Sequence, residues 1–92
     1  MTGIKIIALN KRGTNALMQH EREQLRHSWS ERRVFNGLYK QTVTSDPLTI
    51  TIEHKNARVA QLIPFESMLV PIVAAMTENG ATKDVDYRVE RL

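Results

Sequence analysis

A change of hydropathy pattern along the chain constrains the fold more than any other feature of this sequence. Residues 14–33 (TNALMQHEREQLRHSWSERR) are mostly polar, with apolar residues at helical spacing, which predicts a basic amphipathic helix. Residues 48–53 (LTITIE) and 84–90 (DVDYRVE) instead alternate between apolar and polar side chains, as half-buried β-strands do. A helix and strictly alternating strands in one short chain predict a compact α+β domain.

The N-terminal residues predict a strand and the start of that helix. Residues 4–9 form a short apolar run that indicates a strand, and the glycine in residues 11–13 indicates that this segment is a turn. Thr14 or Asn15 is expected to cap the helix, because either side chain can accept a hydrogen bond from a first-turn backbone N–H. The helix therefore is expected to begin after the turn.

The rest of the chain supplies a hairpin, a second helix and a closing strand. Residues 34–44 and 48–53 predict a hairpin, since Ser-Asp-Pro between them is a turn signal. Residues 57–63 fit either a third strand or a helical turn, and a strand is favoured because a proline follows them. Residues 65–79 predict a helix that is kinked at its internal proline or begins there, and that ends at Asn-Gly. Residues 84–90 close the chain as a strand.

Alternation also assigns strand side chains to the two faces of the sheet. The residues expected to point into the core are Leu48, Ile50, Ile52, Val85, Tyr87 and Val89. Those between them, Thr49 and Asp86 included, are expected in solvent. The whole predicts a single domain over residues 1–92, with an antiparallel sheet of four or five strands and two helices. If residues 57–63 are not a strand, the order becomes β-α-β-β-α-β, the split order of ferredoxin-like folds.

Size and composition limit the kinds of function that the chain can have. A domain of 92 residues buries only about 60–65% of its unfolded surface and has no room for a deep cleft between lobes, which disfavours an enzyme. The absence of cysteine excludes disulfides and thiolate metal sites. No apolar run is long enough for a signal peptide or a membrane span. We therefore expect a cytoplasmic protein with no membrane partner and no cofactor.

The charge of the chain is unevenly distributed. Residues 1–40 carry eight basic and three acidic side chains, a net charge of +5, whereas residues 41–92 carry five basic and seven acidic ones, a net charge of −2. Such a split would draw a polyanion, or an acidic protein surface, to the N-terminal part. A plainer interpretation is that the charges keep a small domain soluble.

The basic residues around the first helix form the best candidate site. Guanidinium groups contact phosphates well, and an indole ring offers a face on which a nucleobase can stack. The candidate nucleic-acid-binding residues are Lys11, Arg12, Arg22, Arg26, Trp29, Arg32 and Arg33. The competing interpretation makes Trp29 a core residue, because it continues a narrow apolar stripe with Met18 and Leu25. The arginines remain available in either case.

Three other clusters are explained more simply as solvent-facing or structural side chains. His20, Glu23 and His27 share one helix face, but the two histidines lie two turns apart, too far to grip one metal ion. The carboxylates of residues 84–90 could serve a metal-dependent nuclease. The alternation of apolar and polar residues already explains them, however, as the solvent-exposed face of a strand. The threonines of residues 42–51 are explained as cross-strand pairs that stabilise a sheet. No catalytic residue is expected.

Three functions follow as hypotheses, and the least favoured is a small Mg²⁺- or Mn²⁺-dependent enzyme that uses the carboxylates of Asp84, Asp86 and Glu90. The preferred one is a small non-enzymatic module that contacts DNA or RNA phosphates through the basic residues of the first helix. The alternative is a protein–protein accessory factor, such as an inhibitor, an assembly subunit or a small viral regulator, that uses the same helix or a strand edge. In the second case the partner is an acidic protein surface or a second copy of the chain, giving a homodimer.

Overall fold

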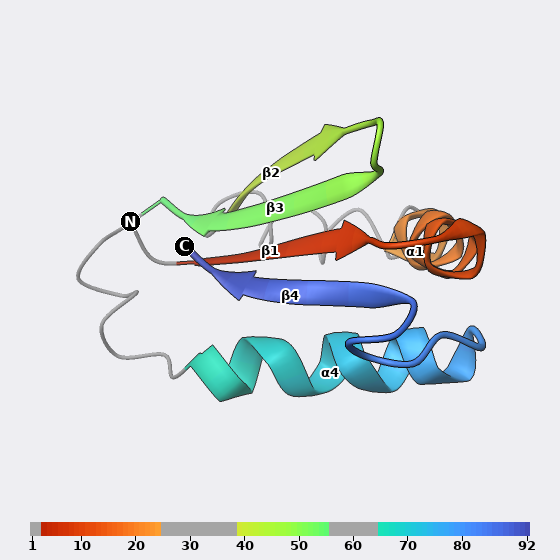
Figure 1. Ribbon diagram of the computed structural model, residues 1–92. Helices are drawn as coiled ribbons and strands as arrows, with labels where there is room; N and C mark the ends of the chain where they lie inside the picture. The colour runs from red at the N-terminus through yellow and green to blue at the C-terminus, as the bar shows by residue number, and fades with distance from the viewer. Residues whose placement is uncertain (1–2, 25–38, 56–64) are drawn as a thin grey trace.

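A computed structural model describes residues 3–24, 39–55 and 65–92 of the chain. Its elements, in order, are β1 (Gly3–Ala8), α1 (Lys11–Gln24), β2 (Tyr39–Thr44), β3 (Thr49–His54), α4 (Phe65–Glu78) and β4 (Tyr87–Arg91), as Figure 1 shows. The four strands form one antiparallel sheet in the order β2-β3-β1-β4. Two helices and an antiparallel sheet confirm the predicted α+β class. The described elements follow one another as β-α-β-β-α-β, the split order of ferredoxin-like folds. Residues 57–63, for which a strand is predicted, lie outside the described residues.

The sheet is held in register by isoleucines on its two central strands. Ile4 lies opposite Ile52, and Ile6 lies opposite Ile50 on one side and Val89 on the other. Residues directly opposite each other in an antiparallel pair point to the same face. A slip by one residue would turn the whole set to the other face, so this pattern fixes the pairing. The predicted hairpin of β2 and β3 is confirmed, with a turn at Ser-Asp-Pro.

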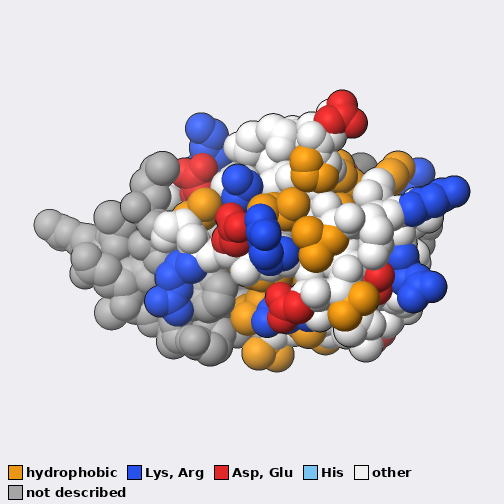
Figure 2. Space-filling view, in the orientation of Figure 1, with side chains coloured by type: hydrophobic (Ala, Val, Ile, Leu, Met, Phe, Trp, Pro, Cys, Tyr) orange, Lys and Arg blue, Asp and Glu red, His pale blue; other side chains and the backbone are white. Residues whose placement is uncertain are grey.

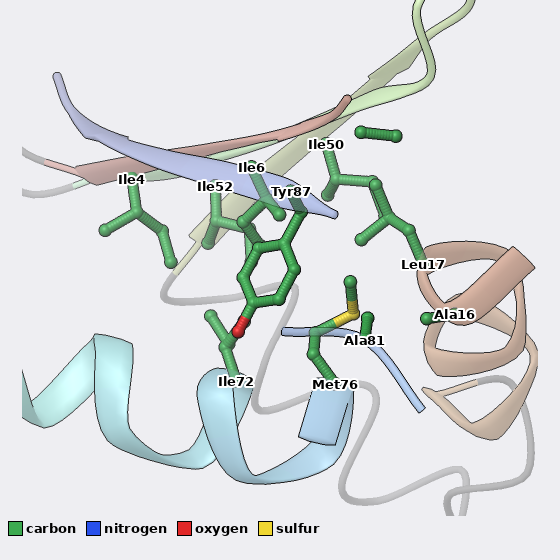
Figure 3. Packing of buried hydrophobic residues seen from close by; sticks show 11 residues of the cluster. Ile4, Ile6, Ala16, Leu17, Ile50, Ile52, Ile72, Met76, Ala81 and Tyr87 are labelled. Atoms are coloured by element: carbon green, nitrogen blue, oxygen red, sulfur yellow. The ribbon is translucent and has the colours of Figure 1, made fainter. Parts of the chain in front are cut away.

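Both helices pack on the isoleucine face of the sheet. In Figure 3 the side chains of β1, β3 and β4 point toward Ile72 and Met76 of α4, with Leu17 of α1 beside them. Leu17 and Met76 are completely buried. Burial of one such side chain is worth about 1.5–3 kcal/mol. The core therefore has three parts, the sheet and one side of each helix.

The first helix begins earlier than the sequence predicts. Residues 11–13 are its first turn and not a separate turn, so Thr14 and Asn15 are not its cap. Asn10 is the cap: its Oδ1 accepts a hydrogen bond from the Gly13 N–H at 2.9 Å, and its carbonyl accepts one from the Thr14 N–H at 2.9 Å. The prediction is wrong because Gly13 resembles a helix breaker in the sequence. In the structure Gly13 instead lets another segment come close.

The predicted apolar stripe of this helix is wrong at Met18, its one member among the described residues. Met18 is 39% exposed, and the helix buries Ala16 and Leu17 on another side. Leu25 and Trp29, the other members of the predicted stripe, lie outside the described residues. Ala16 and Leu17 do not suggest an anchor in the sequence because they are a single adjacent pair without a repeat.

Several side chains near the strands depart from simple alternation. Leu48, Ile50 and Ile52 face the core as predicted, but Thr49 is also buried, and its hydroxyl donates to the Pro47 carbonyl at 3.0 Å. In the last strand, Tyr87 and Val89 face the core as predicted. Val85 is 63% exposed and Asp86 only 3% exposed, the reverse of the expectation. The reason is that β4 starts at Tyr87, so the residues before it form a turn with no strand periodicity.

The end of α4 follows the predicted signal. The helix runs through its internal Pro71 without interruption. Gly80 has a φ of 88° and donates to the Thr77 carbonyl, while Ala81 donates to the Met76 carbonyl. This is a Schellman motif, in which the residue after the cap adopts the left-handed conformation that glycine favours. Ala81 and Met76 are both buried, which adds the hydrophobic contact typical of the motif.

Replacement of Gly13 tests the close approach between α1 and the turn before β4. A Cβ atom at this position would lie 1.8 Å from the Asp86 carbonyl oxygen. Gly13→Ala is therefore expected to lower the free energy of unfolding by about 3 kcal/mol, measured by urea denaturation. Asn15→Ala, an exposed change on the same helix, is the matched control and should be close to neutral. Equal stability of the two variants would contradict the packing described here.

Removal of the Tyr87 hydroxyl tests the core. This side chain is completely buried, its hydroxyl points toward Ile72 in Figure 3, and no described residue offers it a hydrogen bond. Burial, with a smaller contribution from Asp84, raises its pKa. Because a buried hydroxyl without a partner is costly, Tyr87→Phe should leave the free energy of unfolding unchanged or raise it by up to about 1 kcal/mol. A clear loss of stability would show that the hydroxyl has a partner.

Candidate nucleic-acid interface

The structure describes three of the seven predicted site residues. Lys11, Arg12 and Arg22 all belong to α1 and are all exposed. The other four, Arg26, Trp29, Arg32 and Arg33, lie outside the described residues. The candidate interface is therefore built from α1.

The exposed residues of α1 form one continuous face. An α-helix turns by about 100° per residue and rises about 1.5 Å, so Lys11 and Arg22 point in nearly the same direction, about 16 Å apart along the axis. The exposed side chains of the helix all lie within about 120° of one another around its axis, and they are Lys11, Arg12, Asn15, Met18, Gln19 and Arg22, here named the α1 face. Three cations and no carboxylate belong to it.

Packing on the opposite side of the helix fixes the direction of this face. Ala16 and Leu17 are buried in the core. The Asn79 amide donates to the Ala16 carbonyl at 3.2 Å, which ties the end of α4 to α1. Since the buried side cannot rotate without breaking these contacts, the α1 face is held toward solvent. Figure 1 shows α1 at the end of the sheet, where its outer side is not covered by a strand.

The cations of the α1 face are not neutralised by ion pairs. None of Lys11, Arg12 and Arg22 has a carboxylate within ion-pair distance among the residues that the structure describes. Glu21 and Glu23 are half-buried and flank the face. The N-terminus of a helix carries partial positive charge, which adds to that of Lys11 and Arg12 in the first turn. Two of the three cations of this face thus stand at its N-terminal end, and the third, Arg22, stands near its C-terminal end.

An open hollow of about 760 Å³ lies beside that end. Its lining consists of Asn10, Lys11, Arg12, Asn15, Asn79, Gly80 and Asp86. Figure 2 shows Lys and Arg side chains gathered at the end of the molecule where α1 begins. The hollow lies where the start of α1 meets the end of α4. Apart from Gly80 its lining residues have polar or charged side chains, and it is open to solvent, which suits a charged group on a larger molecule better than an enclosed small substrate.

Asp86 is a structural carboxylate at the back of this hollow. Its Oδ2 accepts from the Thr82 N–H at 2.8 Å, and its Oδ1 accepts from the Asn10 amide at 3.0 Å. The pKa of Asp86 is lower than its ordinary value, chiefly because of the hydrogen bond from Thr82 and then that from Asn10. The nearby charge of Arg12 lowers this pKa further, whereas burial opposes the shift. The carboxylate thus fastens the turn before β4 to the cap of α1.

The other acidic clusters are separated by the structure. Asp84 is exposed and pairs with Lys83 at 3.5 Å, and Glu90 pairs with Arg88 at 2.9 Å. With Asp86 buried in the turn, the carboxylates of residues 84–90 do not form one site. Within residues 3–24, 39–55 and 65–92, no group of three His, Asp or Glu side chains could hold a metal ion. His27, one of the two histidines considered for a metal site, lies outside these ranges.

Sequence reasoning missed the uncharged members of this region. Asn10 and Asn79 hold the helices in place, and Asn15 and Gln19 stand on the α1 face. Only Asn10 had a usable signal, since asparagine directly before a helix is a common cap. The other three give no periodic pattern, so their roles depend on tertiary contacts.

Comparisons of the sequence and the structure with known proteins found no match. No protein-family profile matches the sequence, and no curated protein or solved structure is significantly similar to it. Of the helices described, none is long and apolar enough to cross a membrane.

The role of Asp86 predicts a specific pH dependence of stability. Because its pKa is lower in the folded protein than the ordinary value of 3.8, the charged carboxylate stabilises the fold above that pH and the benefit is lost as the pH falls through the folded-state pKa. Asp86→Asn should be less stable than the wild type at neutral pH and should lose part of the acid-induced decline. Urea denaturation between about pH 2 and 7 measures both effects.

Asp84→Asn is the matched control for this experiment. Asp84 is exposed and has a φ of 66°, a conformation that asparagine tolerates as well as aspartate does. This variant should keep the acid-induced decline of the wild type. If the two variants behave alike, Asp86 does not have the structural role described.

Proposed function

We propose that this protein is a small non-enzymatic binding module that contacts the phosphates of a nucleic acid through the α1 face. One observation carries the proposal: three cations stand on a single exposed side of one helix, and within the described residues no carboxylate stands among them or pairs with them. A nucleic-acid backbone presents regularly spaced negative charges. Binding by such a surface gains free energy mainly by releasing the counterions that surround those phosphates.

The spacing of the cations suits an extended polyanion. Lys11 and Arg22 are about 16 Å apart, farther than one phosphate group can bridge. Two or more phosphates are therefore needed to satisfy both ends of the face. Arg12 stands near Lys11, where its charge already lowers the pKa of Asp86, so Lys11 and Arg22 are the cations most available to a partner.

The open face of the sheet lacks a comparable surface. Cross-strand register places Lys5 opposite Glu90 and Lys40 opposite Glu53. Figure 2 shows basic and acidic side chains next to each other over the strands. Opposite charges that face each other across strands stabilise the sheet, and Glu90 also pairs with Arg88 at 2.9 Å, so the cations of this face stand among carboxylates. On the sheet the cations thus stand opposite carboxylates, whereas the three cations of the α1 face have no carboxylate among them.

The outer edge of β2 favours the second candidate function, a protein–protein accessory factor. Among the described strands, only β3 borders β2, and five of the six residues of β2 are exposed. Val43 is 42% exposed at this edge. A strand of a partner protein, or of a second copy of the chain, could add to the sheet here. Such binding would depend little on salt, which separates it from binding by the α1 face.

The salt dependence of binding tests the proposed function. The double variant Lys11→Ala/Arg22→Ala should bind labelled oligonucleotides more weakly than the wild type, because it lacks two cations that contact phosphates. The slope of log affinity against log salt concentration should also become shallower, by roughly 1.4–1.8 for the two phosphates together. Fluorescence anisotropy between roughly 50 and 200 mM salt measures both.

Lys40→Ala is the matched control, since it removes an exposed cation that lies on β2, away from the α1 face. Its affinity and salt slope should equal those of the wild type. The proposal fails if no oligonucleotide binds at low salt. It fails as well if Lys40→Ala weakens binding as much as the double variant does.

A further inference from the structure

We infer that the nucleic acid is double-stranded DNA and that α1 enters its major groove, with Asn15 and Gln19 contacting the base edges. This inference rests on the proposed function and specifies its ligand. It depends on the order of side-chain types along the α1 face and on the amides in its middle, and the face itself carries no aromatic side chain on which a base could stack.

The α1 face has charged ends and an uncharged middle. Lys11 and Arg22 mark the two ends, and between them lie Asn15, Met18 and Gln19, all exposed. Asn15 and Gln19 are one turn apart, so their amides stand side by side on the helix surface. A helix that lies in a groove places its end residues near the phosphate walls and its middle residues near the floor. The α1 face has the residue types that each of these positions needs.

The chemistry of the middle residues fits base edges. Asparagine and glutamine form paired hydrogen bonds with the N6 and N7 atoms of adenine in the major groove, and apolar side chains contact the thymine methyl group. The major groove is about 12 Å wide, which admits a helix of about 10–12 Å diameter. Met18 is 39% exposed without a core role, which leaves it available for such an apolar contact.

The amides of Asn15 and Gln19 differ from the other amides of this region. The Asn10 amide is used in a hydrogen bond to Asp86, and the Asn79 amide in one to the Ala16 carbonyl. Asn15 and Gln19 make no such bond with any described residue. The structure therefore uses two amides to hold α1 in place and leaves the two on its outer side available for a ligand.

Single strands and RNA duplexes fit this surface less well. Sequence-tolerant binding of single strands needs exposed aromatic rings for base stacking. In the part of the chain that the structure describes, Tyr87 is completely buried, Tyr39 is half-buried against His54, and the large exposed apolar side chains are aliphatic. The major groove of an RNA duplex is too deep and narrow for side chains to reach the bases. Duplex DNA is the form whose groove accepts the α1 face.

Selection from a pool of random-sequence DNA duplexes tests the inference, followed by affinity measurements on the enriched sequence and on a scrambled one. The wild type should enrich a motif that contains adenine and prefer it over the scrambled duplex. The double variant Asn15→Ala/Gln19→Ala should reduce that preference by roughly 5- to 150-fold for each amide–adenine pair removed, and leave the salt slope on scrambled DNA unchanged. Both substitutions are exposed and favour helix formation, so the fold is retained.

Gln41→Ala is the matched control, because it removes an exposed amide on β2. It should keep the full preference of the wild type. Lys11→Ala/Arg22→Ala should weaken binding to the enriched and scrambled duplexes alike.

The outcomes separate this inference from the proposed function. The inference is overturned if no motif is enriched, if Asn15→Ala/Gln19→Ala keeps the preference, or if single-stranded DNA or an RNA duplex binds as tightly as duplex DNA. In each of these cases, salt-dependent binding that needs Lys11 and Arg22 leaves the proposed function standing. Absence of binding to every nucleic acid at low salt overturns both.

Discussion

The arrangement of this protein depends on the contact between the first turn of α1 and the turn before β4. Gly13 has no side chain, which allows the Asp86 backbone to pack directly against the helix. The Asp86 carboxylate accepts hydrogen bonds from the side-chain amide of the cap residue Asn10 and from the Thr82 N–H. One side chain thus connects the start of α1, the segment after α4 and the turn before β4. The Asp86 carboxylate is itself buried, and the two hydrogen bonds offset the cost of removing it from water.

This contact determines where α1 points. The strand β1 leads into the helix at its pairing with β4, where Ala8 lies opposite Tyr87. With the start of α1 fixed against the following turn, Leu17 enters the core and the Ala16 carbonyl meets Asn79. The outward direction of Lys11 and Arg22 is thus a consequence of contacts on the other side of the helix. The basic surface is a product of the fold and not only of the composition.

The parts of the structure that follow regular periodicity were predictable from the sequence. The alternation of Ile50 and Ile52 placed β3 correctly, and Asn-Gly marked the end of α4. Errors arose where a tertiary contact overrides a local signal. Gly13 resembles a breaker until the Asp86 backbone is seen beside it, and Asp86 fits an alternating strand until its hydrogen bonds show a turn. The helical wheel of α1 pointed to Met18 because it aligns with Leu25 and Trp29, whereas the core accepts Leu17, which has no such repeat.

The residues that anchor α1 are not the residues of the α1 face, so the face can vary without loss of the fold. Its six side chains are exposed, and none of them holds the helix in place; the anchors are Ala16, Leu17 and the Asn10 cap. A substitution on the face therefore changes what the helix presents to a partner with little effect on folding, since surface changes away from such anchors usually shift stability by less than about 0.5 kcal/mol. Binding and stability can be measured on the same variants, and a loss of binding without a loss of stability is attributable to the surface itself.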